Sequence, residues 1–133
     1  MSGELAEIEN MIKDATMNVL SDEEFIDKET LEYMWSKLDG KITEVESSKE
    51  RNKMMAAMGF LGAEQLFSPL IIDIIKGALT ILLAESVSKG FKATYSKFEK
   101  KVREKAKKVG VPSKLINKVI GEIKKKLNYT FRK

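Results

Sequence analysis

The sequence predicts an all-α protein, a four- to five-helix bundle with one very apolar central helix. Apolar residues recur at steps of three and four along almost the whole chain, which is the period of an amphipathic helix. Capping motifs, glycines and a proline divide this pattern into segments, and strand-like alternation and internal repeats are absent. The chain has 133 residues, 43% of them apolar, so a single helical-bundle domain over residues 1–133 is expected.

The first helix is expected over residues 4–20, where Leu5, Ile8 and Ile12 share one face. The segment Ser21-Asp-Glu-Glu24 that follows has the spacing of a capping box, in which a hydroxyl and a carboxylate bind the first free N–H groups of a helix. This spacing predicts that a second helix starts there.

A longer helix is expected to begin near Lys41. Its start is indicated by Thr43 and Glu46, which repeat the capping pattern. Gly59 and Gly62 weaken the helical pattern, because glycine loses the most conformational freedom on ordering. The helix is therefore expected to end near these two glycines.

Residues 68–88 form the most apolar stretch and are expected to be the central helix. Ser68-Pro69 predicts its start, because proline at the first helical position lacks only an N–H that has no helical partner there. A helix that is apolar nearly all round is buried in a core, in a subunit interface or in a membrane. A transmembrane span needs about 18 apolar residues, whereas the longest uncharged stretch here is residues 77–84. The sequence therefore predicts no transmembrane span.

Asp73 and Lys76 lie within this apolar stretch, and two interpretations of them stay open. They form an i,i+3 salt bridge on the strip of the helix that reaches solvent, or they make a polar contact that fixes the register of an assembly interface. Ile74 and Leu82 are expected to be buried. The helix has more apolar circumference than one small bundle covers, which favours a homo-oligomer.

Two basic helices are expected after Gly90. The first runs to the Gly110-Val-Pro112 turn and buries residues such as Phe98 and Val102. The second runs over residues 113–127. Because the turn between them is so short, the two helices are expected to pack against each other.

The formal charge of +4 conceals a strong asymmetry along the chain. Residues 1–50 contain fourteen acidic and five basic residues, a net charge of −9. Residues 85–133 contain sixteen basic and four acidic residues, a net charge of +12. Such asymmetry favours nucleic acid or another polyanion as the partner of the basic part. Alternatively, the acidic helices neutralise the basic helices inside one bundle.

The residue types required by most catalytic and metal sites are missing. Cysteine and histidine are both absent, which excludes disulfides, thiolate or imidazole ligands and a histidine base. The carboxylates of Glu7, Asp14, Glu24 and Glu32 lie off the apolar helix faces, so we expect them in solvent rather than paired for acid–base chemistry. Phosphate-binding and metal-binding motifs are absent. A non-enzymatic protein is expected, with no catalytic residues, metal or cofactor.

Residues 106–120 resemble the helix-turn-helix of small DNA-binding repressors. Ala106 precedes Gly110 by four positions, and Ile116 and Val119 follow the glycine by six and nine. In that motif the small residue lets two helices approach, the glycine makes the turn and the later apolar residues seat the recognition helix. The resemblance implies that the major groove is faced by Ser113, Lys114, Asn117 and Lys118, and that phosphates are reached by Lys107, Lys108, Lys124 and Lys125.

The overall character of the chain resembles the small all-α coat and structural proteins of viruses that infect hyperthermophilic archaea, of the two-tailed or spindle-shaped type. The shared features are many lysines, one very apolar helix and a lack of cysteine and histidine. Charged residues make up 33% of the chain, which is typical of thermophilic proteins. The start of the chain lacks a basic and an apolar signal region, so a cytoplasmic location in the producing cell, or a place in the virion, is expected.

The sequence supports three functional hypotheses. The first is a self-associating structural protein, a component of a virion or nucleoprotein, whose basic C-terminal helices contact nucleic acid. The second is a helix-turn-helix transcription regulator, in which the same helices read a DNA sequence. The third is a protein-binding inhibitor of a nucleic-acid enzyme such as RNA polymerase, which uses its charge to enter a nucleic-acid channel.

Overall fold

The computed structural model describes residues 2–60 and 66–131, and throughout these ranges the regular structure is helical. It contains six α-helices and one short 3₁₀ helix, so the expected number of four to five was too low. The elements are α1 (Ser2–Glu24), α2 (Lys28–Lys37), η1 (Ile42–Glu44), α3 (Ser48–Ala57), α4 (Ser68–Lys89), α5 (Phe91–Val109) and α6 (Ser113–Phe131).

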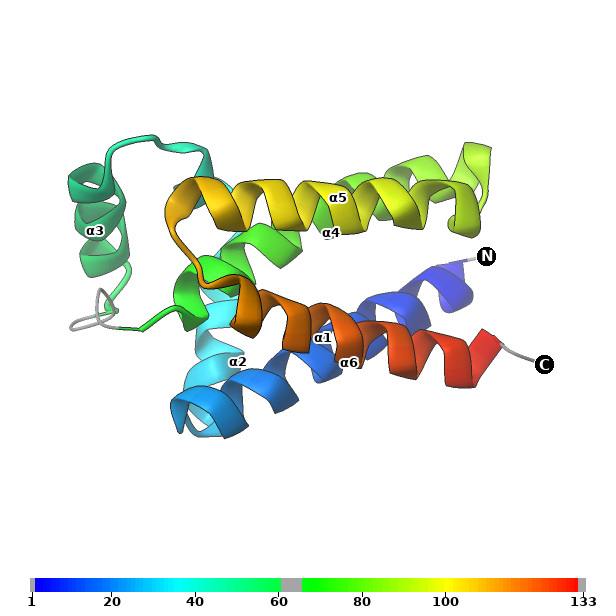
Figure 1. The fold of residues 1–133 in the computed structure, drawn as a ribbon, viewed down its shortest axis with the longest axis horizontal. Coiled ribbons are helices and arrows are strands. Elements are labelled where there is room, and N and C mark those ends of the chain that lie inside the picture. Colours follow the sequence, from blue (N-terminus) through cyan, green and yellow to red (C-terminus); the bar gives the residue numbers. More distant parts are fainter. Residues whose placement is uncertain (1, 61–65, 132–133) are drawn as a thin grey trace.

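The long helices form two pairs, α4 with α5 and α1 with α6 (Figure 1). Helix α2 and η1 pack on α4, and α3 lies beyond them at one end of the molecule. The expected packing of α5 against α6 is only a minor contact. Each of these helices has a single apolar face, and that face is turned mainly toward α4 in the case of α5 and toward α1 in the case of α6.

The core is built mainly from branched aliphatic side chains, and α4 contributes many of them. Residues 71–75 of α4 are all buried in succession. Ile74 and Leu82, expected to be buried, are 0% and 2% exposed. In the second half of the helix, however, Ile81 and Val87 are 41% and 63% exposed. None of the helices in the described ranges combines the length and apolar character needed to cross a membrane.

Glu24 does not start a helix, as the capping-box pattern predicted, but ends α1 and caps α4. Its carboxylate accepts hydrogen bonds from the backbone N–H groups of Phe67, at 2.9 and 3.0 Å, and Ser68, at 2.6 Å. The N-cap of α2 is Asp27, which accepts from the N–H of Thr30 at 2.8 Å. Hydrogen bonds from Thr30 hold the pKa of Asp27 below its ordinary value. The first free amides of α4 thus find their acceptor in a distant helix.

Replacing Glu24 with alanine is expected to lower the free energy of unfolding by about 1–2 kcal/mol, because α4 loses the acceptor of its first N–H groups. Urea denaturation followed by circular dichroism measures this loss. The control is Glu23→Ala, which removes an exposed carboxylate paired with Lys118 and is expected to cost no more than about 1 kcal/mol. Equal losses in the two variants would contradict the capping role.

The helix expected from Lys41 onward is interrupted. Residues 42–44 form η1, and α3 begins only after Ser47, whose hydroxyl accepts from the N–H of Glu50 at 3.3 Å. The buried guanidinium of Arg51 donates to the carbonyls of Val45, at 2.7 Å, and Glu46, at 2.9 Å. These carbonyls therefore lie in a turn rather than a helix. A glycine at position 59 with φ of +92° follows α3, as expected, whereas Gly62 lies outside the described residues.

Asp73 and Lys76 form neither of the two arrangements considered for them. Asp73 is fully buried and accepts hydrogen bonds from the N–H of Gly40 at 2.9 Å, the N–H of Thr43 at 2.8 Å and the hydroxyl of Thr43 at 2.7 Å. Lys76 donates to the carbonyl of Trp35, and its ammonium lies 5.5 Å from the centre of the Trp35 rings. Burial lowers the pKa of Lys76. Lys76 therefore ties α4 to α2, and Asp73 ties it to the segment that follows α2.

Candidate nucleic-acid interface

All eight residues predicted to contact nucleic acid lie at the surface. They are Lys107, Lys108, Ser113, Lys114, Asn117, Lys118, Lys124 and Lys125, and each of them is exposed. The reason is the amphipathic pattern of α5 and α6. Phe98, Val102 and Ala106 of α5 are buried, as are Ile116 and Ile123 of α6, so the intervening polar positions remain in solvent.

On α5 the lysines form a stripe along one face. An open depression of about 470 Å³ is lined by Glu104 and by five lysines. The lysines are Lys100 together with Lys97, Lys101, Lys105 and Lys108, which are spaced by four, four and three residues. We call these five residues the α5 lysine stripe. Only Lys108 among them was predicted from the sequence. The other four could have been found from their helical spacing, because residues three and four apart lie on one face of a helix.

On α6 the predicted residues divide between two faces. Lys114, Lys118 and Lys125 are spaced by four and seven residues and lie opposite the buried face. Asn117 and Lys124 lie on the flank that looks toward α5. The carbonyl oxygen of the Asn117 side chain accepts a hydrogen bond from the guanidinium of Arg103, and the ammonium of Lys124 lies 3.4 Å from the carboxylate of Glu99. The predicted set is thus not one continuous surface.

Acidic residues from the first part of the chain neutralise some of the basic ones. The ion pairs that join the two parts are Lys105–Glu44 at 3.8 Å, Lys108–Glu46 at 3.6 Å and Lys118–Glu23 at 2.9 Å. In contrast, Lys100, Lys101, Lys107, Lys114 and Lys125 have no carboxylate within ion-pair distance among the described residues. Neutralisation inside the bundle is therefore real but partial.

A second depression, of about 420 Å³, lies beside the α5 lysine stripe. Its lining includes Ser96, Lys100 and Arg103 of α5 and Lys124 of α6. Tyr95 also lines it, and burial raises the pKa of its hydroxyl. Lys100 belongs to both depressions, so cationic side chains continue from the outer face of α5 toward α6.

The segment that resembles a helix-turn-helix has the local features implied by its residues. Ala106 is buried, Gly110 has a φ of +85°, and Ile116 and Val119 are buried. However, α6 packs mainly against α1 and runs back in roughly the opposite direction to α5 (Figure 1). In a helix-turn-helix the two helices cross at about 90–120°. The observed arrangement is closer to a splayed helical hairpin.

No cluster of three or more acidic residues in the described ranges is placed to hold a metal ion. The chain matches no protein-family model, no curated protein and no solved structure. The feature of the molecule that indicates a function is therefore the arrangement of its basic residues.

Proposed function

We propose that the protein is a non-enzymatic structural component of a nucleoprotein, such as a virion, that self-associates and contacts nucleic acid through α5 and α6. In this proposal α4 is the apolar centre of the bundle and α5 is its main cationic surface. The observation that carries the proposal is the α5 lysine stripe, which lines an open depression and in which Lys100 and Lys101 have no ion-pair partner among the described residues.

The dimensions of the stripe suit a phosphate backbone. From Lys97 to Lys108 the helix rises by about 16 Å, at about 1.5 Å per residue. One strand of duplex DNA presents a phosphate about every 3.4 Å along its axis, so the stripe spans about five phosphates. Exposed ion pairs such as Lys108–Glu46 contribute only about 0–1 kcal/mol, and phosphates can replace the carboxylates at little cost.

The predicted base-reading residues are not all free to face a groove. Lysine binds phosphate as a point charge and can also contact guanine, whereas asparagine reads adenine through its side-chain amide. Asn117, the asparagine predicted to face the major groove, is bonded to Arg103 on the flank of α6. These features support binding that is independent of sequence, and they favour a structural protein over a transcription regulator.

Replacing Lys100 and Lys101 with alanine is expected to weaken binding to all DNA sequences alike. Affinity falls with salt by a log–log slope of about −0.9 per phosphate contacted, so the double variant should reduce the slope by up to about 1.8. The measurement is fluorescence anisotropy on a random and a defined duplex over a range of salt concentrations. The matched control is the double variant Lys28→Ala with Lys49→Ala, which removes the same charge from exposed positions in the acidic part.

Two further variants distinguish the hypotheses. Replacing Lys124 and Lys125 with alanine should also weaken binding uniformly, whereas Asn117→Ala should leave the ratio of affinities for defined and random DNA unchanged. A selective loss of the defined sequence in Asn117→Ala would instead support a regulator that reads bases. If neither DNA nor RNA is bound at low salt, the proposed nucleic-acid contact is wrong, and the stripe is better explained by an acidic protein surface.

A further inference from the structure

Phe25 occupies an unusual position in the turn between α1 and α2. Its side chain is 91% exposed, although it is a large aromatic residue. Its φ is +56°, a left-handed conformation that favours glycine and strains other residues. The residues on either side are anchored, because Glu24 caps α4 and Asp27 caps α2. The turn therefore presents a phenyl ring to solvent at a cost to the folded chain, a combination typical of functional positions.

The surroundings of Phe25 are acidic. Asp22, Glu23, Asp27 and Glu29 lie within four residues of it along the chain and are all exposed, against one exposed base, Lys28. The turn thus combines one apolar anchor with several carboxylates. We call residues 22–29 the acidic Phe25 turn. A surface that receives it must offer a small apolar depression with cations at its rim.

A crevice between α4 and α5 has these properties. Its apolar lining comes from Ala78, Ile81 and Leu82 of α4 and Phe98 of α5, and its volume is about 170 Å³. A dry apolar cavity of about 150 Å³ is large enough to bind benzene, so the crevice matches the size of a phenyl ring. Ile81, at 41% exposed, is the accessible part of its apolar wall.

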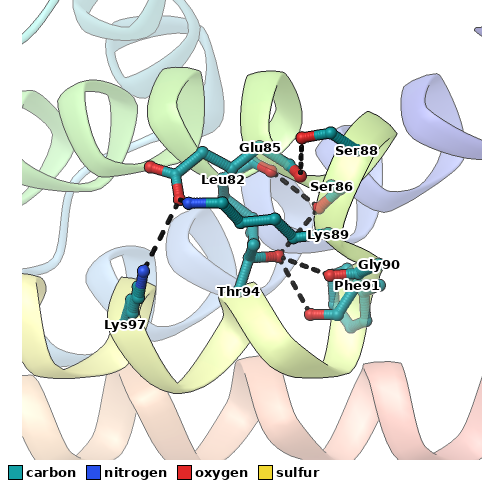
Figure 2. A network of polar contacts seen from close by, with 9 residues as sticks. All are labelled: Leu82, Glu85, Ser86, Ser88, Lys89, Gly90, Phe91, Thr94 and Lys97. Atoms are coloured by element: carbon teal, nitrogen blue, oxygen red, sulfur yellow. Dashed lines mark hydrogen bonds and ion pairs between the residues drawn. The ribbon is translucent and has the colours of Figure 1, made fainter.

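The rim of the crevice is cationic. Lys97 and Lys101 line it, and both also belong to the α5 lysine stripe. The carboxylate at the rim, Glu85, lies 3.4 Å from the ammonium of Lys89 and 3.9 Å from that of Lys97, so its charge is compensated (Figure 2). Lys101 has no such partner among the described residues. An incoming carboxylate therefore meets a net positive rim.

Hydrogen bonds hold the two walls of the crevice in place. The hydroxyls of Ser86 in α4 and Thr94 in α5 lie 3.0 Å apart (Figure 2). Ser86 also donates to the carbonyl of Leu82 at 2.6 Å. The α4–α5 turn is thus fixed next to the crevice, and a partner does not have to order it on binding.

We propose that the acidic Phe25 turn of one copy of the chain docks in the α4–α5 crevice of a second copy, with the Phe25 ring against Ile81 and its carboxylates toward Lys97 and Lys101. This inference rests on the self-association in the proposed function and specifies its interface. Figure 1 places the α1–α2 turn at the lower left, whereas α4 and α5 run beside each other across the upper part of the molecule. Because the two surfaces lie on different parts of the molecule, the contact is head-to-tail and leads to rings or filaments rather than a two-fold dimer.

Sedimentation velocity of the wild-type chain over a range of concentrations, without nucleic acid, tests the contact. Phe25→Gly is expected to weaken self-association by about ten- to a hundredfold, the loss expected from exposing one phenyl ring. Glycine adopts positive φ without strain, so the variant is expected to stay folded, which circular dichroism checks. The control is Val87→Ser, which changes an exposed apolar residue outside the crevice and is expected to assemble like the wild type.

A mixing experiment separates this contact from other modes of assembly. Ile81→Glu closes the crevice but keeps the Phe25 turn, whereas Phe25→Gly keeps the crevice. At a concentration where the wild type just assembles, each variant alone is expected to be monomeric, and an equimolar mixture is expected to form a heterodimer that grows no further. A monomeric mixture, or wild-type assembly by Phe25→Gly, would overturn the inference.

The failure of this inference is distinguishable from the failure of nucleic-acid binding. The Lys100 and Lys101 double variant should lose DNA affinity, while Phe25→Gly should bind DNA like the wild type at concentrations where both are monomeric. A wild-type chain that binds DNA but stays monomeric at high concentration would disprove the interface alone.

Discussion

Asp73→Ala is expected to lower the free energy of unfolding by about 3–5 kcal/mol, because it leaves buried donors without their acceptor. The N–H groups of Gly40 and Thr43 and the hydroxyl of Thr43 all bind this carboxylate. These donors are buried, so water cannot easily replace the carboxylate as their acceptor. Urea denaturation of the wild type and the variant gives the difference directly.

Asp73→Asn is a finer form of the same experiment. One carboxylate oxygen of Asp73 accepts from Gly40 and the other from Thr43, so an amide in either orientation turns its NH₂ group toward one backbone N–H. A loss of about 1–3 kcal/mol is expected. Asp39→Asn, at an exposed carboxylate 3.6 Å from the ammonium of Lys41, should change stability by less than about 0.5 kcal/mol. If Asp73→Asn were as mild as Asp39→Asn, the three hydrogen bonds would not support the fold.

Gly40→Ala is expected to cost about 3 kcal/mol, the sum of two separate effects. Gly40 has a φ of +97°, which strains any other residue by about 1–2 kcal/mol. A Cβ atom at this position would also lie 2.7 Å from the Cα of Gly77, so the chain and α4 would have to separate, at about 1–3 kcal/mol. Differential scanning calorimetry or urea denaturation measures the total.

Two other glycines separate these effects. Gly110 is left-handed, with a φ of +85°, but no atom lies within 4 Å of the position that a Cβ would take, so Gly110→Ala reports the backbone strain alone. Gly121 lies in α6 with no atom near a Cβ, and Gly121→Ala is expected to stabilise the protein by up to about 1 kcal/mol through helix propensity. Equal losses for Gly40→Ala and Gly110→Ala would mean that the close approach to Gly77 carries no penalty.

The second half of the chain was predictable because its signals are local. Proline in the first turn of α4 and the glycines at 90 and 110 set the ends of α4 and α5, and the apolar period of α5 and α6 identified their buried faces. The exposure of the predicted lysines followed from that same period. In the first part, the spacing of Ser21 and Glu24 was equally clear but misleading, because one pattern fits both a helix start and a helix end that caps another helix.

The features that were missed depend on contacts between distant segments. Nothing in the sequence near Asp73 indicates that its carboxylate binds residues 40–43. The crevice between α4 and α5 and the depression on α5 arise only when the two helices are paired. Phe25 was missed for another reason, since an aromatic residue in a sequence is usually assigned to the core.

The carboxylates of Glu24 and Asp73 bind mainly backbone N–H groups. The side chains of the donor residues can therefore change while the hydrogen bonds that hold the fold remain. Every amino acid except proline supplies such a donor, so Phe67 can be exchanged for many residues while its bond to Glu24 remains. A particular residue type is required at Glu24 and Asp73, which supply the acceptors, and at Gly40, which must approach Gly77 closely. Distant homologues of this chain would share these few residues and could differ almost everywhere else. These residues, rather than overall sequence similarity, would then identify them.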